Sequence, residues 1–282
     1  MGVCTVARDD FRNGLQSYFV LGVVLVFVGV TALVFTAEIA IYDHPARALW
    51  DVQQAVILVE PVLVAALCYR AVVGDRTSGR VRFSLGLPNT RAEYFVGKVL
   101  ARAGIVTLAT VASLAAGYLV ALFAFAKPPS IVDFALFAGT TTAFLLSLTS
   151  LFMAISAVVD SRPAAMVGAF AAYFLLVPFV LGITPFMSLG TLLNALSDLT
   201  GASIGPSTQQ LVKSATPYPA YGGITNRVFL DIADQYDHLP TPTESQRTKL
   251  HAQVWFQLLV LVGWSLGSIV VGYVGFKRKD LT

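Results

Sequence analysis

The sequence predicts an all-α polytopic membrane protein with six transmembrane helices, both chain ends inside and a long outer loop between spans five and six. Only 12% of its 282 residues are charged and 56% are hydrophobic, whereas soluble domains carry about 25% charged residues. Apolar stretches of bilayer-crossing length recur along the chain. Lys and Arg gather in alternate connections between these stretches. Together these observations predict a single transmembrane domain over residues 1–282.

Six stretches meet the length that a membrane span requires, about 20 mostly apolar residues for roughly 30 Å of hydrocarbon. The first follows a leader containing Asp9 and Asp10, which are unsuited to the cationic start of a cleaved secretory signal. We therefore expect the first apolar run to be retained as a span. The six expected spans lie near residues 17–35, 53–73, 101–125, 134–159, 164–186 and 254–276.

Polar residues mark the start of two of these helices. Ser130 and Asp133 have the spacing of a capping box before the fourth span. Ser161 followed by Pro163 is typical of a helix start and predicts a tight hairpin before the fifth span.

The distribution of Lys and Arg predicts the orientation, because cytoplasmic loops are enriched in both residues. The short loops of the opposite side hold Arg47 and Lys127. We therefore expect a cell (plasma) membrane protein with both termini and the loop 74–98 in the cytoplasm. The residues assigned to this side are Arg8, Arg12, Arg70, Arg76, Arg80, Arg82, Arg91, Lys98, Arg102, Arg162, Lys277, Arg278 and Lys279.

The long segment 187–253 is then extracytoplasmic, and we expect it to be a small polar insertion. Residues 189–199 predict a helix near the membrane surface, and Thr243 with Gln246 is spaced to cap a helix that leads into span six. Turns are expected at Pro217, Pro219, Gly222 and Gly223.

No cofactor or metal is expected in this chain. Gly74 and Gly79 have the spacing of a Walker A loop, but Arg80 and Val81 stand where Lys and Ser or Thr are needed. Any ATP and Mg would then be bound by a partner chain. The sequence has neither an HExxH motif nor two His at i, i+4, so a zinc enzyme is unsupported. Nucleic acid is not expected as a partner.

The sixth span holds a motif with two interpretations. Gly263, Ser265 and Gly267 match the nucleophile pattern GxSxG, so an intramembrane hydrolase using Ser265 is one alternative. The same glycines form a GxxxG, which lets helices approach closely. Helix packing is favoured, because all three histidines lie outside the expected spans and no imidazole base is evident.

Glu60 is the acid that lies well inside an expected span, directly before Pro61. An ionisable group in the bilayer is costly, which makes Glu60 a candidate for the translocation path. The alternative is that span two begins later, which would leave Glu60 near the outer headgroups. The sequence favours neither.

The loop between spans two and three combines apolar and cationic residues. Pro88 ends one segment, and Thr90 with Glu93 forms a capping box that starts a helix leading into span three. Between Gly79 and Pro88, apolar residues alternate with arginines. This pattern is typical of an anchor on anionic membrane lipid and also of a docking element for a cytosolic partner.

The order of residues in this loop resembles a known family. The run from Val73 to Lys98, VGDRTSGRVRFSLGLPNTRAEYFVGK, is similar to the signature of ABC-2 type ABC-transporter permeases. There an acidic-basic pair, a small-residue-Gly step, a Leu-rich stretch, Pro, Arg and Gly-Lys recur in the same order. The leader 8–12 and the tail 275–281 are also similar to the ends of family members, and the leader resembles the family's interfacial helix.

The resemblance implies one transmembrane half of an ATP-driven transporter. Its partners would be an ABC ATP-binding subunit and a second permease copy, identical or a paralogue, and export is the default direction. The residues implied to contact the ATPase are Asp75, Arg76, Gly79 and Arg80, where the family usually has Glu in place of Asp75. Those implied to shape the following turn and helix are Leu87, Pro88, Arg91, Gly97 and Lys98. Besides the hydrolase, a non-transporting membrane scaffold or regulator is the rival function.

Overall fold

The computed structural model describes residues 2–41, 45–81, 90–125, 128–183, 187–200, 205–229 and 249–279. Over these residues the regular structure is helical, without a strand. Six helical segments are long and apolar enough to cross a membrane, which confirms the predicted all-α, six-span fold. They cover Tyr18–Glu38, Arg47–Thr77, Arg91–Ala124, Ile131–Val158, Arg162–Leu181 and Val254–Lys277.

The individual helices divide some of these spans. Before residue 130 the elements are α1 (Val3–Leu15), α2 (Tyr18–Ile41), α3 (Pro45–Leu58), α4 (Glu60–Cys68), α5 (Val73–Thr77) and α7 (Arg91–Ala124). The later elements are α8 (Ile131–Val158), α9 (Arg162–Leu176), α10 (Pro178–Leu181), α11 (Leu189–Thr200), α12 (Pro206–Ser214), α13 (Pro217–Thr225), η2 (Leu250–Ala252) and α15 (Val254–Lys277).

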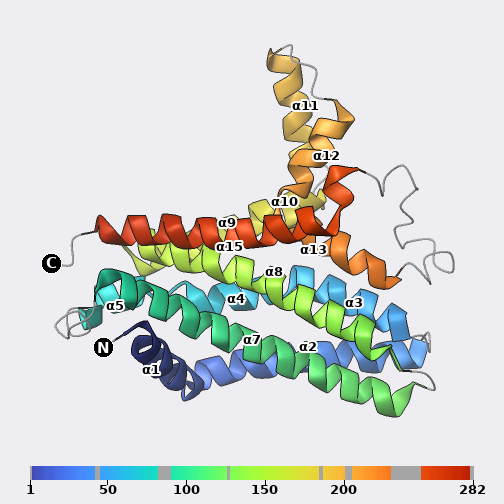
Figure 1. Cartoon of the computed structure of the whole chain (residues 1–282), viewed down its shortest axis with the longest axis horizontal. Coiled ribbons are helices and arrows are strands. Elements are labelled where there is room, and N and C mark those ends of the chain that lie inside the picture. Colours follow the sequence, from blue (N-terminus) through green and yellow to red (C-terminus); the bar gives the residue numbers. More distant parts are fainter. Residues whose placement is uncertain are drawn as a thin grey trace.

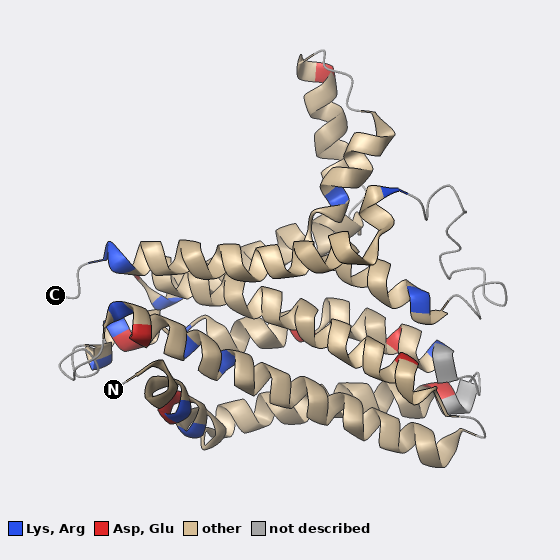
Figure 2. Ribbon diagram, in the orientation of Figure 1, with Lys and Arg blue, Asp and Glu red and all other residues tan. Residues whose placement is uncertain are grey.

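The long helices run side by side, and both chain ends lie at the same end of the bundle as α5 (Figure 1). Charged residues are concentrated toward the two ends of the bundle and are rare along its middle (Figure 2). The grouping of the termini with the α5 loop agrees with the predicted topology. We call the end that holds α1, α5 and the end of α15 the basal end. Its cytoplasmic location stays a prediction from the Lys and Arg distribution.

Local capping chemistry sets several helix ends. Thr90 and Glu93 form the predicted capping box at the start of α7, each side chain bonding the other's backbone N–H. Ser161 caps α9 through the Ala164 N–H. Ser130 caps α8, but it accepts from the Val132 N–H at 3.3 Å rather than from Asp133.

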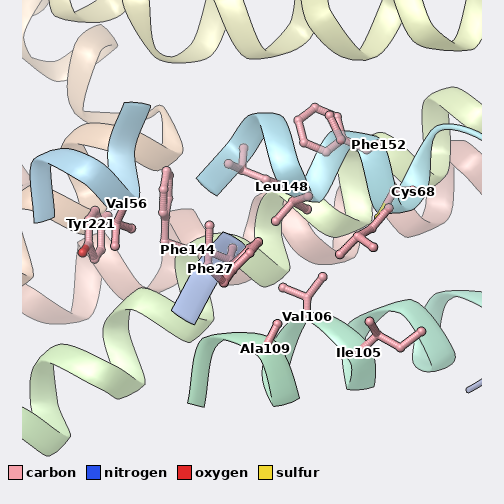
Figure 3. Close-up of a cluster of buried hydrophobic side chains, with 14 of the residues drawn as sticks. Phe27, Val56, Cys68, Ile105, Val106, Ala109, Phe144, Leu148, Phe152 and Tyr221 are labelled. Atoms are coloured by element: carbon pink, nitrogen blue, oxygen red, sulfur yellow. The ribbon is translucent and has the colours of Figure 1, made fainter. Parts of the chain in front are cut away.

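The core is built around α8, whose inner face is fully buried. Phe144, Leu148 and Phe152 on α8 point into a cluster with side chains of α2, α3, α4, α7 and α13 (Figure 3). The buried hydroxyls of Thr140, Thr149 and Ser150 donate to carbonyls of their own helix four residues earlier. Because these hydroxyls are satisfied locally, they can be packed between helices.

Prolines break two of the spans. Pro61 has no N–H to donate, and the helix is interrupted at Val59, where the Val62 N–H bonds to the Val59 carbonyl. The Leu58 carbonyl accepts instead from the Tyr173 hydroxyl of α9 at 2.8 Å. Pro178 likewise separates α9 from α10, so discontinuous helices occur in both the second and the fifth span.

Part of the expected polar insertion enters the bundle. The helix expected at 189–199 is α11, which has no buried residue and projects away from the bundle with α12 (Figure 1). The prolines and glycines expected to mark turns instead lie in α13, where Pro217 and Pro219 occupy the first turn, in which proline is tolerated. Tyr221 of α13 is fully buried and stacks on Phe144 at 4.7 Å between ring centroids. Thr243 and Gln246 lie outside the described residues.

Candidate functional site

Most residues of the predicted coupling loop that the structure describes are fixed to helices at the basal end. There α5 lies among α1, the start of α7, the turn between α8 and α9, and the end of α15. Three bonding networks hold it.

The first network fixes the elbow between α4 and α5. The Ser156 hydroxyl of α8 donates to the Tyr69 carbonyl at 2.8 Å. It also accepts from the backbone N–H groups of Val72 and Val73 at 3.1 and 3.2 Å. Ser156 is fully buried, so one hydroxyl satisfies three backbone groups that the break in the helix leaves open.

The second network pairs buried charges. The Lys98 ammonium of α7 lies 2.6 Å from carboxylate oxygens of both Asp10 on α1 and Asp75 on α5. The Tyr94 hydroxyl donates to Asp75 at 2.8 Å, and Arg102 lies 3.4 Å from Asp10. The Lys98 side chain is only 9% exposed, a burial that a cation tolerates when it is paired.

A close helix crossing supports this pairing. A Cβ added at Gly97 would lie 2.7 Å from the Val6 side chain and 3.1 Å from the Val3 carbonyl of α1. Only glycine therefore lets α1 approach α7 closely enough for Asp10 to reach Lys98.

The third network joins α5 to the chain end. Arg76 pairs with Asp160 at 2.9 Å and donates to the Ala157 carbonyl at 2.9 Å. Lys279 donates to both oxygens of Asp160 at 2.6 and 2.7 Å. Hydrogen bonds from Lys279, and then from Arg76, lower the pKa of the Asp160 carboxyl.

Arg91 adds a further tie to the chain end. It donates to the carbonyls of Lys277 and Lys279 at 2.6 and 3.1 Å.

The residues left facing outward form a short turn. Ser78 and Arg80 are exposed, and Gly79 has φ +75°, a left-handed conformation that glycine adopts without strain. The Arg80 side chain makes no hydrogen bond or ion pair with any residue that the structure describes. Leu87 and Pro88 lie outside the described residues.

A family model described as "ABC-2 family transporter protein" matches residues 4–281. The chain belongs to the ABC-2 transporter family. It is therefore a multi-pass membrane protein and the membrane component of a transporter. No curated protein matches the chain significantly.

For an ABC-2 family member, the structure separates the predicted coupling residues into two groups. Asp75, Arg76 and Lys98 point into the bundle and are paired there, whereas Gly79 and Arg80 lie on the outer turn. The sequence did not indicate the partners that hold the first group, which are Asp10, Tyr94 and Asp160. It also gave no coupling role to Ser156, which bonds the elbow, or to Lys279, which bonds Asp160. The sequence features that could have indicated these partners were Asp10 in the charged leader and Asp160 in the expected hairpin.

Glu60 lies far from this site, at the break between α3 and α4. It is 2% exposed, and its Oε2 atom has no hydrogen-bond partner within the described chain. The second span begins at Arg47, so Glu60 lies about 20 Å along it at 1.5 Å per residue. This placement favours a position inside the span over one near the outer headgroups.

Gly263 and Gly267 do not pack within the described chain. A Cβ added at either would meet no atom within 4 Å, and both line an apolar groove of about 560 Å³ between α8 and α15. The close contacts of α15 with α8 are made at Gly272 and Gly275 instead. Packing of Gly263 and Gly267 against another chain stays a prediction.

The described residues place no histidine beside Ser265, as the hydrolase alternative would require. The Ser265 hydroxyl donates to the Leu261 carbonyl of its own helix at 2.9 Å. Ser265 lies about 16 Å into α15 at 1.5 Å per residue, whereas His251 precedes that helix in η2. Among the described residues there is also no group of three His, Cys, Asp or Glu placed to hold a metal ion.

Proposed function

We propose that this chain is the permease subunit of an ABC exporter in the plasma membrane and that the turn Ser78–Arg80 docks a separate ATP-binding subunit. The observation that carries the proposal is the contrast within α5 and its turn. Asp75 and Arg76 are bonded to α7 and the α8–α9 turn. The Ser78 and Arg80 side chains of the following turn are exposed, and within the described chain this turn bonds only to α5 itself.

This arrangement suits the transmission of movement. A force on an isolated loop would be absorbed by the loop, but α5 is bonded through Ser156, Lys98 and Asp160 to several spans. ATP binding would close the partner dimer, and the helices bonded to α5 would then switch between two arrangements as rigid elements. ATP and Mg would be held by the partner, and a second permease copy would complete the path.

Within this proposal, Glu60 lines the translocation path. It lies where the second span is discontinuous, and broken helices near the middle of the bilayer are common positions of transporter binding sites. A buried oxygen without a hydrogen-bond partner costs stability, which supports a functional rather than a structural role for Glu60.

Co-purification tests the docking proposal. Tagged wild-type chain, Arg80→Glu and the matched control Arg12→Glu would be isolated in mild detergent, and bound proteins identified by mass spectrometry. Arg12 is an exposed basic residue of α1, so the control makes the same charge change at the basal end. We expect wild type and the control to retain an ATPase with Walker motifs and Arg80→Glu to lose most of it.

Two outcomes contradict the proposal. Wild type that retains no ATPase would remove its central support and favour the scaffold function. Equal retention by all three chains would place the docking site elsewhere.

A further inference from the structure

A cavity of about 610 Å³ opens at the basal end between α1, the α4–α5 elbow and α7. Its described lining includes five cationic side chains and three carboxylates. The bonding networks account for only part of this charge, and what remains determines which ligand the cavity suits.

The carboxylates that reach the inside of the cavity are already neutralised. Asp75 is paired with Lys98, and Asp10 with both Lys98 and Arg102. Asp9 also lines the cavity, but it is exposed on α1.

The remaining cations have no acidic partner. The Arg70 side chain is exposed and makes no ion pair or hydrogen bond with the part of the chain that the structure describes. Arg80 is in the same state, and Arg162 donates only to the neutral Thr77 hydroxyl and Gly74 carbonyl. The cavity therefore carries a positive surplus, which favours an anion.

Arg102 adds a cation at the inner wall of the same cavity. Its side chain is 15% exposed and lies 3.4 Å from Asp10. The Nε atom of Arg102 and the Oδ2 atom of Asp10 are both buried without a hydrogen-bond partner in the described chain, so the guanidinium reaches the cavity through its terminal nitrogens.

The opposite wall is apolar and belongs to the membrane spans. Phe19 and Val20 at the start of α2 and Ala66 and Leu67 near the end of α4 complete the lining. Phe19 is 57% exposed. Inorganic phosphate would gain no binding free energy from this apolar wall. An anionic lipid would use both the basic residues and an apolar surface that leads into the bilayer.

We propose that the cavity binds the headgroup of an anionic phospholipid, with Arg70 and Arg102 donating to its phosphate and the start of an acyl chain lying against Phe19 and Ala66. The bound lipid would join α1, α4 and α7 at the boundary of the bilayer. The proposal requires only that the chain crosses a membrane with this end at one surface, and it holds whichever partner binds at the outer turn.

Lipid binding to the purified full chain tests the proposal. Native mass spectrometry in detergent would count bound phosphatidylglycerol and phosphatidylcholine with the same acyl chains. The variants are Arg70→Gln, which breaks no bond in the described chain, and Arg8→Gln, a matched change at an exposed residue of α1 outside the cavity. Inorganic phosphate serves as the anion without a chain.

We expect wild type and Arg8→Gln to bind phosphatidylglycerol in preference to phosphatidylcholine, with about tenfold weaker binding in Arg70→Gln, the loss of one charge-assisted contact. Arg102→Lys, which keeps the charge but loses the planar set of guanidinium donors, should also bind more weakly. Equal binding of both lipids, or equal losses in Arg70→Gln and Arg8→Gln, would overturn the site. Displacement of the lipid by millimolar inorganic phosphate would overturn the lipid as its ligand.

Discussion

Buried ionisable groups are paired at the basal end of the bundle but not in its middle. At the basal end Lys98 is enclosed by two carboxylates and a tyrosine, and these contacts hold α1, α5 and α7 together. In the second span Glu60 is buried more completely, yet it forms no ion pair within the described chain and its Oε2 atom has no hydrogen-bond partner there. Paired charges position structure, whereas an unpaired charge costs stability and calls for a functional reason.

The largest effect is expected at Lys98. Lys98→Met removes the cation that Asp10 and Asp75 share and leaves Asp75 without an ion pair, so we expect about 3–5 kcal/mol of destabilisation. Thermal unfolding in detergent, followed by circular dichroism, measures it. Adding Asp10→Asn and Asp75→Asn should recover much of the loss, because the uncompensated charges are then removed. A variant that melts with wild type would show that the pairing does not hold this end together.

A smaller loss is expected at Ser156. Ser156→Ala leaves the Val72 and Val73 N–H groups and the Tyr69 carbonyl without this partner, at a cost of about 1–3 kcal/mol. The same unfolding assay applies. Ser265→Ala is the matched control, because that hydroxyl bonds only its own helix. Similar melting of the two variants would contradict the role of Ser156 at the elbow.

At Glu60 we expect the change in stability to have the opposite sign, because substitution should stabilise the fold. Glu60→Leu removes a buried carboxyl that lacks a partner for one oxygen, so we expect a gain of roughly 0.5–2 kcal/mol together with loss of transport-coupled ATP turnover by the reconstituted complex. Glu60→Gln separates charge from volume. Destabilisation by Glu60→Leu would mean that the carboxyl is a structural contact like those of the basal end.

The smallest effect is expected at Asp160, which is exposed. Hydrogen bonds from Lys279 and Arg76 lower the pKa of its carboxyl below the ordinary value of 3.8. A carboxyl with a depressed folded pKa contributes stability above its unfolded pKa and loses it as the pH falls through the folded value. The difference in melting temperature between wild type and Asp160→Asn should therefore be present at pH 6 and vanish near pH 2. A constant difference would contradict the ion pairs.

The six spans were predictable because apolar length is a local property of the sequence. The capping box at Thr90 and Glu93 was predictable for the same reason. The burial of α13 was not, because Pro217, Pro219, Gly222 and Gly223 have the composition of turns and only packing against α8 and α15 makes them helical. The split of the coupling residues into inward and outward groups also depended on distant partners, such as Asp10 for Lys98 and Asp160 for Arg76.

We propose that the ATPase docks on the turn Ser78–Arg80, which paired charges hold from behind. The most direct test places a photo-crosslinking amino acid at position 80 or at position 12 and identifies the adducts formed in membranes. We expect position 80 to capture the ATP-binding subunit and position 12 to capture little of it. Capture from position 12, with none from position 80, would contradict the claim.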